Sequence, residues 1–268
     1  KCASLIIEKG RVNRNTHIVL RGKPIRNLDE KDSYKYLGIN TGIETRVSTM
    51  TLLETVTKEM DLVNQSSLAQ FQKLDCIKSF VLPKLTYMYA NSTPKLTELK
   101  VFANMTMRAI KQIHSIPVKG SPLEYIQLPI SRGGLGVACP KITALIAFLV
   151  NTMKKLWSSD NYIRKLYTDY LMEVARTEIV RANINLQDVA EYLSNDTPID
   201  KNAFGYNTFT RIRDVCNSLT NIQGAPLHKL KIVVKDDKLA ILVQATKDGP
   251  EKVFTHVHEK KLQQMLKP

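Results

Sequence analysis

The stretch Tyr34-Lys35-Tyr36-Leu37-Gly38-Ile39 divides the chain into two kinds of sequence. It is a short run of aromatic, aliphatic and β-branched residues, which favours a strand, and its glycine permits backbone shapes that other residues resist. Short β-type runs and turns precede it, and long stretches with helical periodicity follow it. We therefore predict an α+β fold that is mostly α, with strands before this stretch and helices after it.

Two β-type runs lie before the dividing stretch. Residues 2–8 predict a strand, the polar run 9–15 predicts a turn, and residues 16–20 predict the returning strand of a hairpin. A layer this small is not expected to be stable alone. It therefore suggests the edge of a larger sheet.

Three helical stretches occupy residues 48–115. The second runs over residues 68–85 and contains Pro83, which should kink or divide it because proline has no N–H to donate. Thr93 and Pro94 suit the cap and first turn of the third helix. Apolar residues recur every three or four positions in all three stretches, which predicts a small amphipathic bundle.

Proline and glycine are frequent from residue 117 to residue 140, which predicts a connector. Helical patterns then return, and a hairpin follows in which Asp236-Asp237 is the turn. The expected helices are 141–157, 161–181, 186–193 and 202–219; the expected strands are 229–234, 238–245 and 253–257; a last short helix is expected at 259–266.

The charge of the chain favours a polyanionic partner. The 268 residues contain 39 Lys and Arg against 25 Asp and Glu, a formal net charge of +14. The third predicted helix is the most one-sided part, because no acid occurs between Glu98 and Glu124. A helix that offers only positive charge over this length suits a phosphate backbone. The basic residues on or near it are Lys95, Lys100, Arg108 and Lys111.

Three motifs in order resemble the reverse transcriptase of non-LTR (LINE-type) retrotransposons. They are Lys1-Cys2-Ala3, the Tyr34–Ile39 stretch, and Arg132-Gly133-Gly134-Leu135-Gly136-Val137. The likeness is greatest to the site-specific elements that insert into ribosomal RNA genes. It covers residues 1–140 and becomes thin beyond them.

The resemblance implies a division of the chain and a set of nucleic-acid contacts. Residues 1–47 would be a palm remnant with the primer grip, 48–118 a three-helix thumb, 119–140 the connector, 141–222 a helical post-thumb domain, and 223–268 a small β-containing segment. The implied partners are an RNA template and a DNA primer, together with the palm and fingers of the parent chain. The candidate contacts are Tyr34, Lys35, Tyr36, Leu37, Gly38, Lys95, Lys100, Arg108, Lys111, Lys119, Arg132, Gly133 and Gly134. Arg132 is suited to a paired contact with a phosphate, whereas the glycines after it fit equally a structural turn.

The resemblance places catalysis outside these residues. In the family, paired aspartates precede the Lys-Cys motif and hold Mg²⁺, so the parent polymerase would need Mg²⁺ while this fragment alone is predicted to be inactive and to bind no cofactor. Lys1 matches the lysine near the leaving pyrophosphate. Asp236-Asp237 has the composition of a turn. The cysteines are too far apart for a Cys-x-x-Cys metal site, and none is predicted.

Two other interpretations remain open from the sequence. One is a retrotransposon-derived, non-enzymatic module that a host uses to bind RNA or protein. The other is a segment of an intron maturase or a related splicing factor. No apolar run is long enough to span a bilayer, so we expect no membrane partner. An intracellular location is expected, nuclear for a parent that primes reverse transcription on nicked chromosomal DNA.

Overall fold

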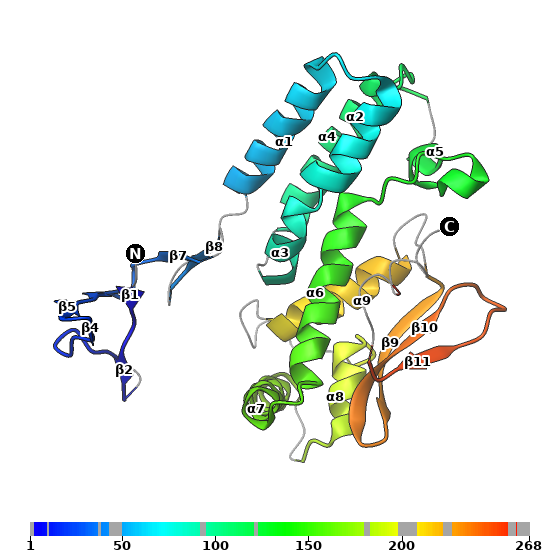
Figure 1. The fold of residues 1–268 in the computed structure, drawn as a ribbon. Helices are drawn as coiled ribbons and strands as arrows, with labels where there is room; N and C mark the ends of the chain where they lie inside the picture. The colour runs from blue at the N-terminus through cyan, green and yellow to red at the C-terminus, as the bar shows by residue number, and fades with distance from the viewer. Residues whose placement is uncertain are drawn as a thin grey trace.

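The structure is a computed structural model that describes residues 3–9, 11–36, 39–42, 50–91, 95–120, 123–179, 183–197, 208–221, 227–256 and 261. Within these residues the fold is α+β and mostly α, as predicted (Figure 1). We call residues 3–42 the strand module, 50–137 the bundle, and 157–256 the C-terminal domain. The long helix α6, Pro140–Leu156, joins the last two.

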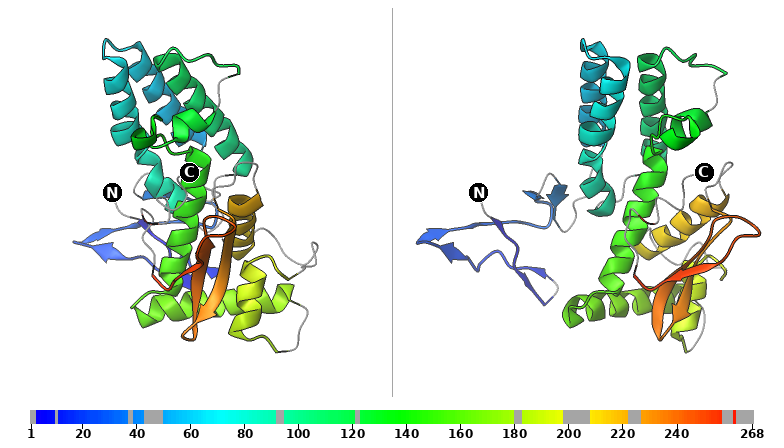
Figure 2. Two further views of the ribbon diagram at one scale, coloured as in Figure 1. Left: turned by 90° about the vertical axis from the view of Figure 1, so that its right-hand side faces the viewer. Right: turned by 45° about the vertical axis from the view of Figure 1, so that its right-hand side comes forward.

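The strand module contains only short strands. They are β1 (Ala3–Ser4), β2 (Ile7–Glu8), β3 (Arg11–Val12), β4 (Val19–Leu20), β5 (Lys23–Pro24), β6 (Arg26–Asn27), β7 (Tyr34–Tyr36) and β8 (Ile39–Thr41). They form four separate two-stranded sheets, of which β1–β6 is parallel and the others are antiparallel. The module projects from one side of the molecule (Figures 1 and 2).

The predicted N-terminal hairpin is wrong in its register. β2 turns back at once and pairs with β3, and β4 pairs with β5. Lys9, Arg21 and Gly22 have φ values of 50°, 51° and 73°, which is the conformation that closes two-residue hairpin loops. Residues 16–20 therefore do not return along residues 2–8.

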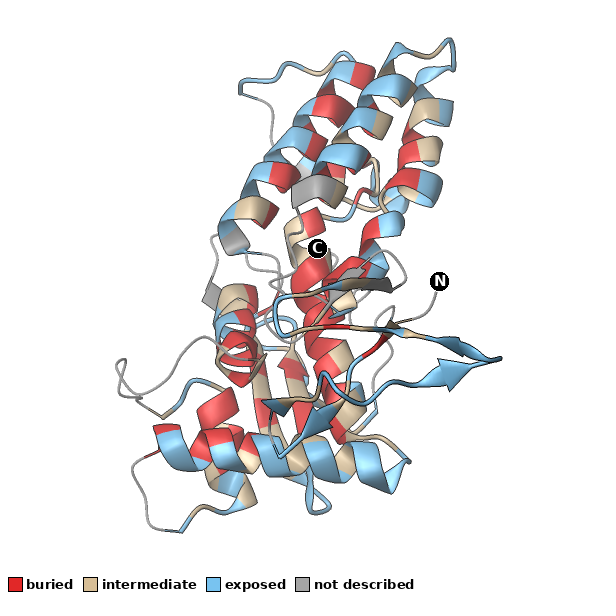
Figure 3. Cartoon of the chain, turned by 90° about the vertical axis from the view of Figure 1, so that its left-hand side faces the viewer, coloured by how far each residue is buried: buried red, intermediate tan, exposed pale blue. Residues whose placement is uncertain are grey.

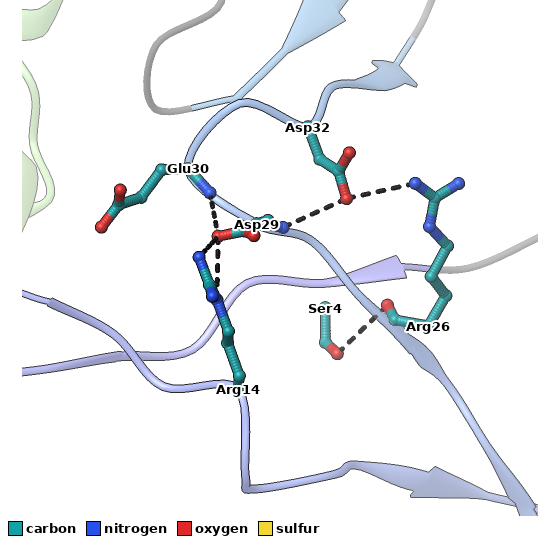
Figure 4. A network of polar contacts seen from close by, with 6 residues as sticks. All are labelled: Ser4, Arg14, Arg26, Asp29, Glu30 and Asp32. Atoms are coloured by element: carbon teal, nitrogen blue, oxygen red, sulfur yellow. Dashed lines mark hydrogen bonds and ion pairs between the residues drawn. The ribbon is translucent and has the colours of Figure 1, made fainter.

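A network of mostly exposed polar contacts links the loops and strands of the strand module (Figure 4). The Asp29 carboxylate accepts hydrogen bonds from Arg14 at 3.1 and 2.7 Å and from the Glu30 amide at 2.8 Å. Those hydrogen bonds, the Glu30 amide first, lower the pKa of Asp29. Arg26 pairs with Asp32 at 3.1 Å. The basic side chains of Arg14 and Arg26 are therefore already matched by acids.

The bundle consists of the helices α1 (Met50–Gln65), α2 (Gln70–Cys76), η1 (Ile77–Val81), α3 (Lys84–Asn91) and α4 (Leu96–Ile113). α4 begins at Leu96 with Lys95 at its N-cap, two residues after the predicted cap, Thr93; Thr93 and Pro94 themselves lie outside the described residues. Each long helix turns a buried stripe inward, and these stripes form one apolar cluster (Figure 3). That cluster includes Val56, Met60, Ile77, Leu85, Leu99 and Phe102.

Pro83 divides the second helix, as predicted, and the means of division is a π-helical turn. The turn η1 comes directly before the proline, and the Leu82 amide donates to the Ile77 carbonyl at 2.9 Å, five residues back. The wider turn accommodates the proline, which has no N–H for the helical ladder. π-Helical turns are often found at functional sites.

The connector contains two short helices, α5 (Leu123–Gln127) and the 3₁₀ turn η2 (Ile130–Arg132). α6 follows and belongs to two cores. Ala144 and Ala147 pack in the bundle, whereas Leu145, Ile146 and Leu149 pack in the C-terminal domain. One helix therefore fixes the bundle against the domain that follows it.

The C-terminal domain packs three helices against a three-stranded antiparallel sheet of order β11-β10-β9. Its elements are α7 (Asn161–Glu178), α8 (Leu186–Leu193), α9 (Thr208–Asn221), β9 (Lys229–Lys235), β10 (Lys238–Gln244) and β11 (Lys252–Phe254). Asp236 and Asp237 form the predicted hairpin turn, with φ values of 51° and 54°. Helices and sheet share one apolar core, to which residues on both sides of residue 222 contribute. Of the helix expected at 259–266, only Lys261 is described.

Candidate nucleic-acid interface

The exposed face of α4 presents positive charge that no acid among the described residues matches. Buried residues such as Leu99, Phe102 and Ile110 occupy one side of this helix. Lys100 and Arg108 lie on the exposed side. They are eight residues apart, which in an α-helix is a rise of about 12 Å. The two cations can therefore contact different phosphates of one strand.

The other predicted cations lie near the two ends of α4 or in the connector. Lys95 is exposed at the N-cap, Lys119 is exposed in the loop after the helix, and Arg132 is exposed at the end of η2. Within the described part of the chain, none of these three side chains, nor Lys100 or Arg108, has a carboxylate within 4.0 Å. These five positive charges are therefore available to an external anion.

Lys111 does not belong to this surface, and the prediction that placed it there is wrong. The residue is only 4% exposed, and its Nζ donates to the Val118 carbonyl at 3.2 Å. The chain folds back after α4, where the Ile116 amide also donates to the Lys111 carbonyl at 2.8 Å. A position that faces solvent on an isolated helix is thus covered by the loop that follows it.

The glycines after Arg132 have a structural role. Gly133 has a φ of 81°, which is unfavourable for other residues. Gly134 is buried, and a Cβ there would lie 2.3 Å from the Leu128 carbonyl oxygen. Their amides donate to Ile130 and Pro129 at 3.0 and 3.1 Å. Because Gly134 is buried and both amides are already used, the structure supports the structural-turn interpretation of these two residues.

The connector that carries Arg132 is anchored on α4. Ile126 and Val137 pack against Met107 and Ile110 of that helix. The Val137 amide also donates to the Ile126 carbonyl at 2.9 Å, which closes the connector into a loop. The connector and the second half of α4 therefore form one packed unit.

The segment resembling a primer grip lies elsewhere. β7 contains Tyr34, Lys35 and Tyr36 and pairs with β8, while Leu37 and Gly38 are outside the described residues, as is Lys1. Tyr34 is half-buried. The strand module and α5 lie on opposite sides of the bundle (Figures 1 and 2). The structure therefore does not bring the Tyr34 segment and the Arg132 segment into one site.

The C-terminal domain contains a buried polar cluster that the sequence did not predict. In the C-terminal domain, Glu178, Arg211 and Arg213 are buried, and the Tyr192 hydroxyl donates to the Glu178 carboxylate. Arg213 donates to the carbonyls of Tyr192 and Thr197 at 2.7 and 2.9 Å. The guanidinium of Arg211 lies over the Phe148 ring. Charged residues in an otherwise apolar helical pattern are the only signal in the sequence for such a cluster.

Metal ligands do not gather in the part of the chain that the structure describes: no group of three or more His, Cys, Asp or Glu side chains could hold an ion there. None of the helices formed by the described residues combines the length and the apolar character that crossing a membrane requires. Cys76, Cys139 and Cys216 are free thiols.

Comparison with known proteins places this chain in a family. A family described as the T26G10.4 domain matches residues 146–268, which are most of α6 and the C-terminal domain. An uncharacterized protein of Caenorhabditis elegans, T26G10.4, is 53% identical over 266 residues, which cover 99% of this chain and 76% of the worm protein. The chain belongs to the T26G10.4 family. The family therefore includes the bundle as well as the C-terminal domain.

Proposed function

We propose that this chain holds a nucleic-acid duplex through its phosphates, along the exposed face of α4 and the loop and connector that follow. In this proposal the duplex is an RNA template paired with a DNA primer, and catalysis belongs to palm residues that precede Lys1 in a parent polymerase. The parent would require Mg²⁺, and no residue of this chain is assigned to bind it.

One observation carries the proposal. Lys100 and Arg108 are exposed on a helix whose sequence has no acid between Glu98 and Glu124, and neither has a carboxylate partner among the described residues. By contrast, Arg14 and Arg26 of the strand module are paired. Phosphate contacts by unpaired cations supply affinity without sequence information. In this proposal the ligand is therefore recognised by its phosphates and not by its base sequence.

The test is a charge reversal with a matched control. Binding of fluorescent RNA–DNA hybrid, double-stranded RNA and double-stranded DNA is measured by anisotropy, for the unchanged chain and for two variants. Lys100→Glu with Arg108→Glu should weaken binding about tenfold or more, equally for different base sequences. Lys235→Glu with Lys252→Glu changes the net charge by the same amount on exposed strand residues of the C-terminal domain. An equal loss in both variants would show attraction by net charge alone, and the α4 surface would be refuted.

A second candidate is a non-enzymatic nucleic-acid-holding module. It is favoured by the length of the worm relative, because the match covers 76% of that protein and leaves about a quarter for anything else. That remainder is shorter than the commonest domain size, about 100–150 residues. Assaying the full-length worm protein on a primed RNA template separates the candidates. Nucleotide incorporation supports a polymerase, and duplex binding without incorporation supports the non-enzymatic module.

A further inference from the structure

A cavity of about 340 Å³ lies where the π-helical turn meets the glycine connector and the start of α6. It is lined by Lys78, Leu82, Pro83, Leu85, Thr86, Tyr89, Gly136, Ala138, Pro140 and Thr143. Its volume is at the lower end of the range for small-molecule sites. The lining is mostly apolar and contains one charged residue, the lysine.

Tyr89 is the first polar group of this cavity that lacks a counterpart. The residue is only 2% exposed, and its hydroxyl is buried without a hydrogen-bond partner in the described part of the chain. Burial raises the pKa of this hydroxyl, so it keeps its proton. A buried tyrosine hydroxyl usually has a partner, because an unmade hydrogen bond there costs free energy. The hydroxyl is therefore a donor without an acceptor, on a residue that lines the cavity.

Lys78 is the second such group. It leaves the π-helical turn at half-burial, and its Nζ donates to the Leu135 carbonyl at 3.2 Å. A Cβ added to Gly136 would lie 3.4 Å from the same Nζ, so the ammonium lies against the connector wall. An ammonium has three N–H donors. No carboxylate among the cavity-lining residues opposes its charge.

We propose that this cavity binds a small ligand with one anionic headgroup and an apolar body. The headgroup, a carboxylate or a phosphate, accepts from Lys78, and an acceptor of the ligand satisfies the Tyr89 hydroxyl. The leucine and proline side chains enclose the apolar body. The cavity residues are different from those on the exposed face of α4. The proposal of a ligand site is therefore independent of whether α4 binds nucleic acid.

The test uses three probes of similar size on the full chain. They are 3-phenylpropionate, phenyl phosphate and the neutral 3-phenylpropanamide, followed in amide NMR spectra. At least one anion should bind saturably and about tenfold more tightly than the amide, since a charge-assisted hydrogen bond is the stronger kind. The shifts should centre on residues 78–89 and 136–143. The tighter anion identifies the headgroup.

Four variants separate a binding role from a structural one. Tyr89→Phe removes only the hydroxyl and should weaken anion binding several-fold, while Lys78→Met should abolish the preference for the anions. Ala138→Phe, at an exposed lining position, should block binding without disturbing the core. Lys100→Met, outside the lining, should bind as the unchanged chain does. The proposal is overturned if no probe binds at millimolar concentration, if shifts lie elsewhere, or if Lys78→Met keeps the preference for the anions.

Discussion

Several cations of the C-terminal domain have partners that the cations on the exposed face of α4 lack. Three cations of the C-terminal domain have partners: Lys229 pairs with Glu251 at 2.6 Å, Lys231 pairs with Asp196 at 2.8 Å, and Arg213 is buried and donates to backbone carbonyls. On the exposed face of α4, Lys100 and Arg108 have no acid partner among the described residues. Matched cations stabilise a fold, whereas unmatched exposed cations are free to contact an external anion.

The difference between cations with partners and cations without them predicts which substitutions should affect stability and which should affect binding. A buried charge that loses its partners is costly, and an exposed one contributes little to the fold. We therefore expect the largest losses of stability in the C-terminal domain and the largest losses of affinity on α4.

Arg213→Met should have the largest effect. The substitution removes the hydrogen bonds that the buried guanidinium donates to the Tyr192 and Thr197 carbonyls and to the Asn195 side chain. The free energy of unfolding should fall by about 3–5 kcal/mol. Fluorescence of Trp157 reports on this domain, since its Nε1–H donates to the Leu239 carbonyl at 2.6 Å. A loss of unfolding free energy below about 1 kcal/mol would contradict the prediction that the partnered cation Arg213 stabilises the C-terminal domain.

Gly134→Ala should come next, with a loss of about 1–3 kcal/mol from overpacking. A Cβ at this position would meet Leu128 at 2.3–2.6 Å, including backbone atoms that cannot move aside. Gly120→Ala is the control for packing, because nothing lies within 4 Å of the added carbon; unlike Gly134, Gly120 has a positive φ, of 81°. Its cost should be only the backbone strain, about 1 kcal/mol. Urea unfolding of both variants compares them, and an equal cost would mean that the connector is not tightly packed.

The third effect is a dependence of stability on pH through His114. Burial lowers the pKa of this imidazole, whose Nε2 is buried without a partner in the described residues. The unfolded chain, with a pKa of about 6.5, then binds the proton more readily than the folded chain. Stability is fully present above about pH 6.5 and is lost as the pH falls through the lower pKa of the folded state. His114→Gln should flatten this part of the urea-midpoint profile, and the exposed His228→Gln should not. Identical slopes would contradict the assignment.

Local sequence signals predicted the local structure well. The helix expected at 186–193 is α8 with the same bounds, because Asn185 caps it and its apolar residues have helical spacing. The turn at Asp236-Asp237 was readable because Asp tolerates a positive φ. Pro83 predicted an interruption of the second helix, because proline has no N–H to donate to the helical hydrogen-bond ladder.

What failed depended on contacts between distant segments. Lys111 is buried by the loop that follows α4. The helical periodicity of α4 alone gives no information about that loop. The register of the N-terminal strands was set by positive φ values at Lys9 and Arg21, residues that rarely adopt them. The buried Glu178–Tyr192 pair required the packing of α7 against α8, which no short pattern encodes.

The most direct test of the central claim, that α4 offers free cations to phosphates, is the salt dependence of duplex binding. The slope of log affinity against log salt is measured for the unchanged chain and for Lys100→Gln with Arg108→Gln. Each lost phosphate contact should reduce the slope by about 0.9, so the account predicts a reduction of about two in the double variant. A slope that stays the same in the double variant would contradict it.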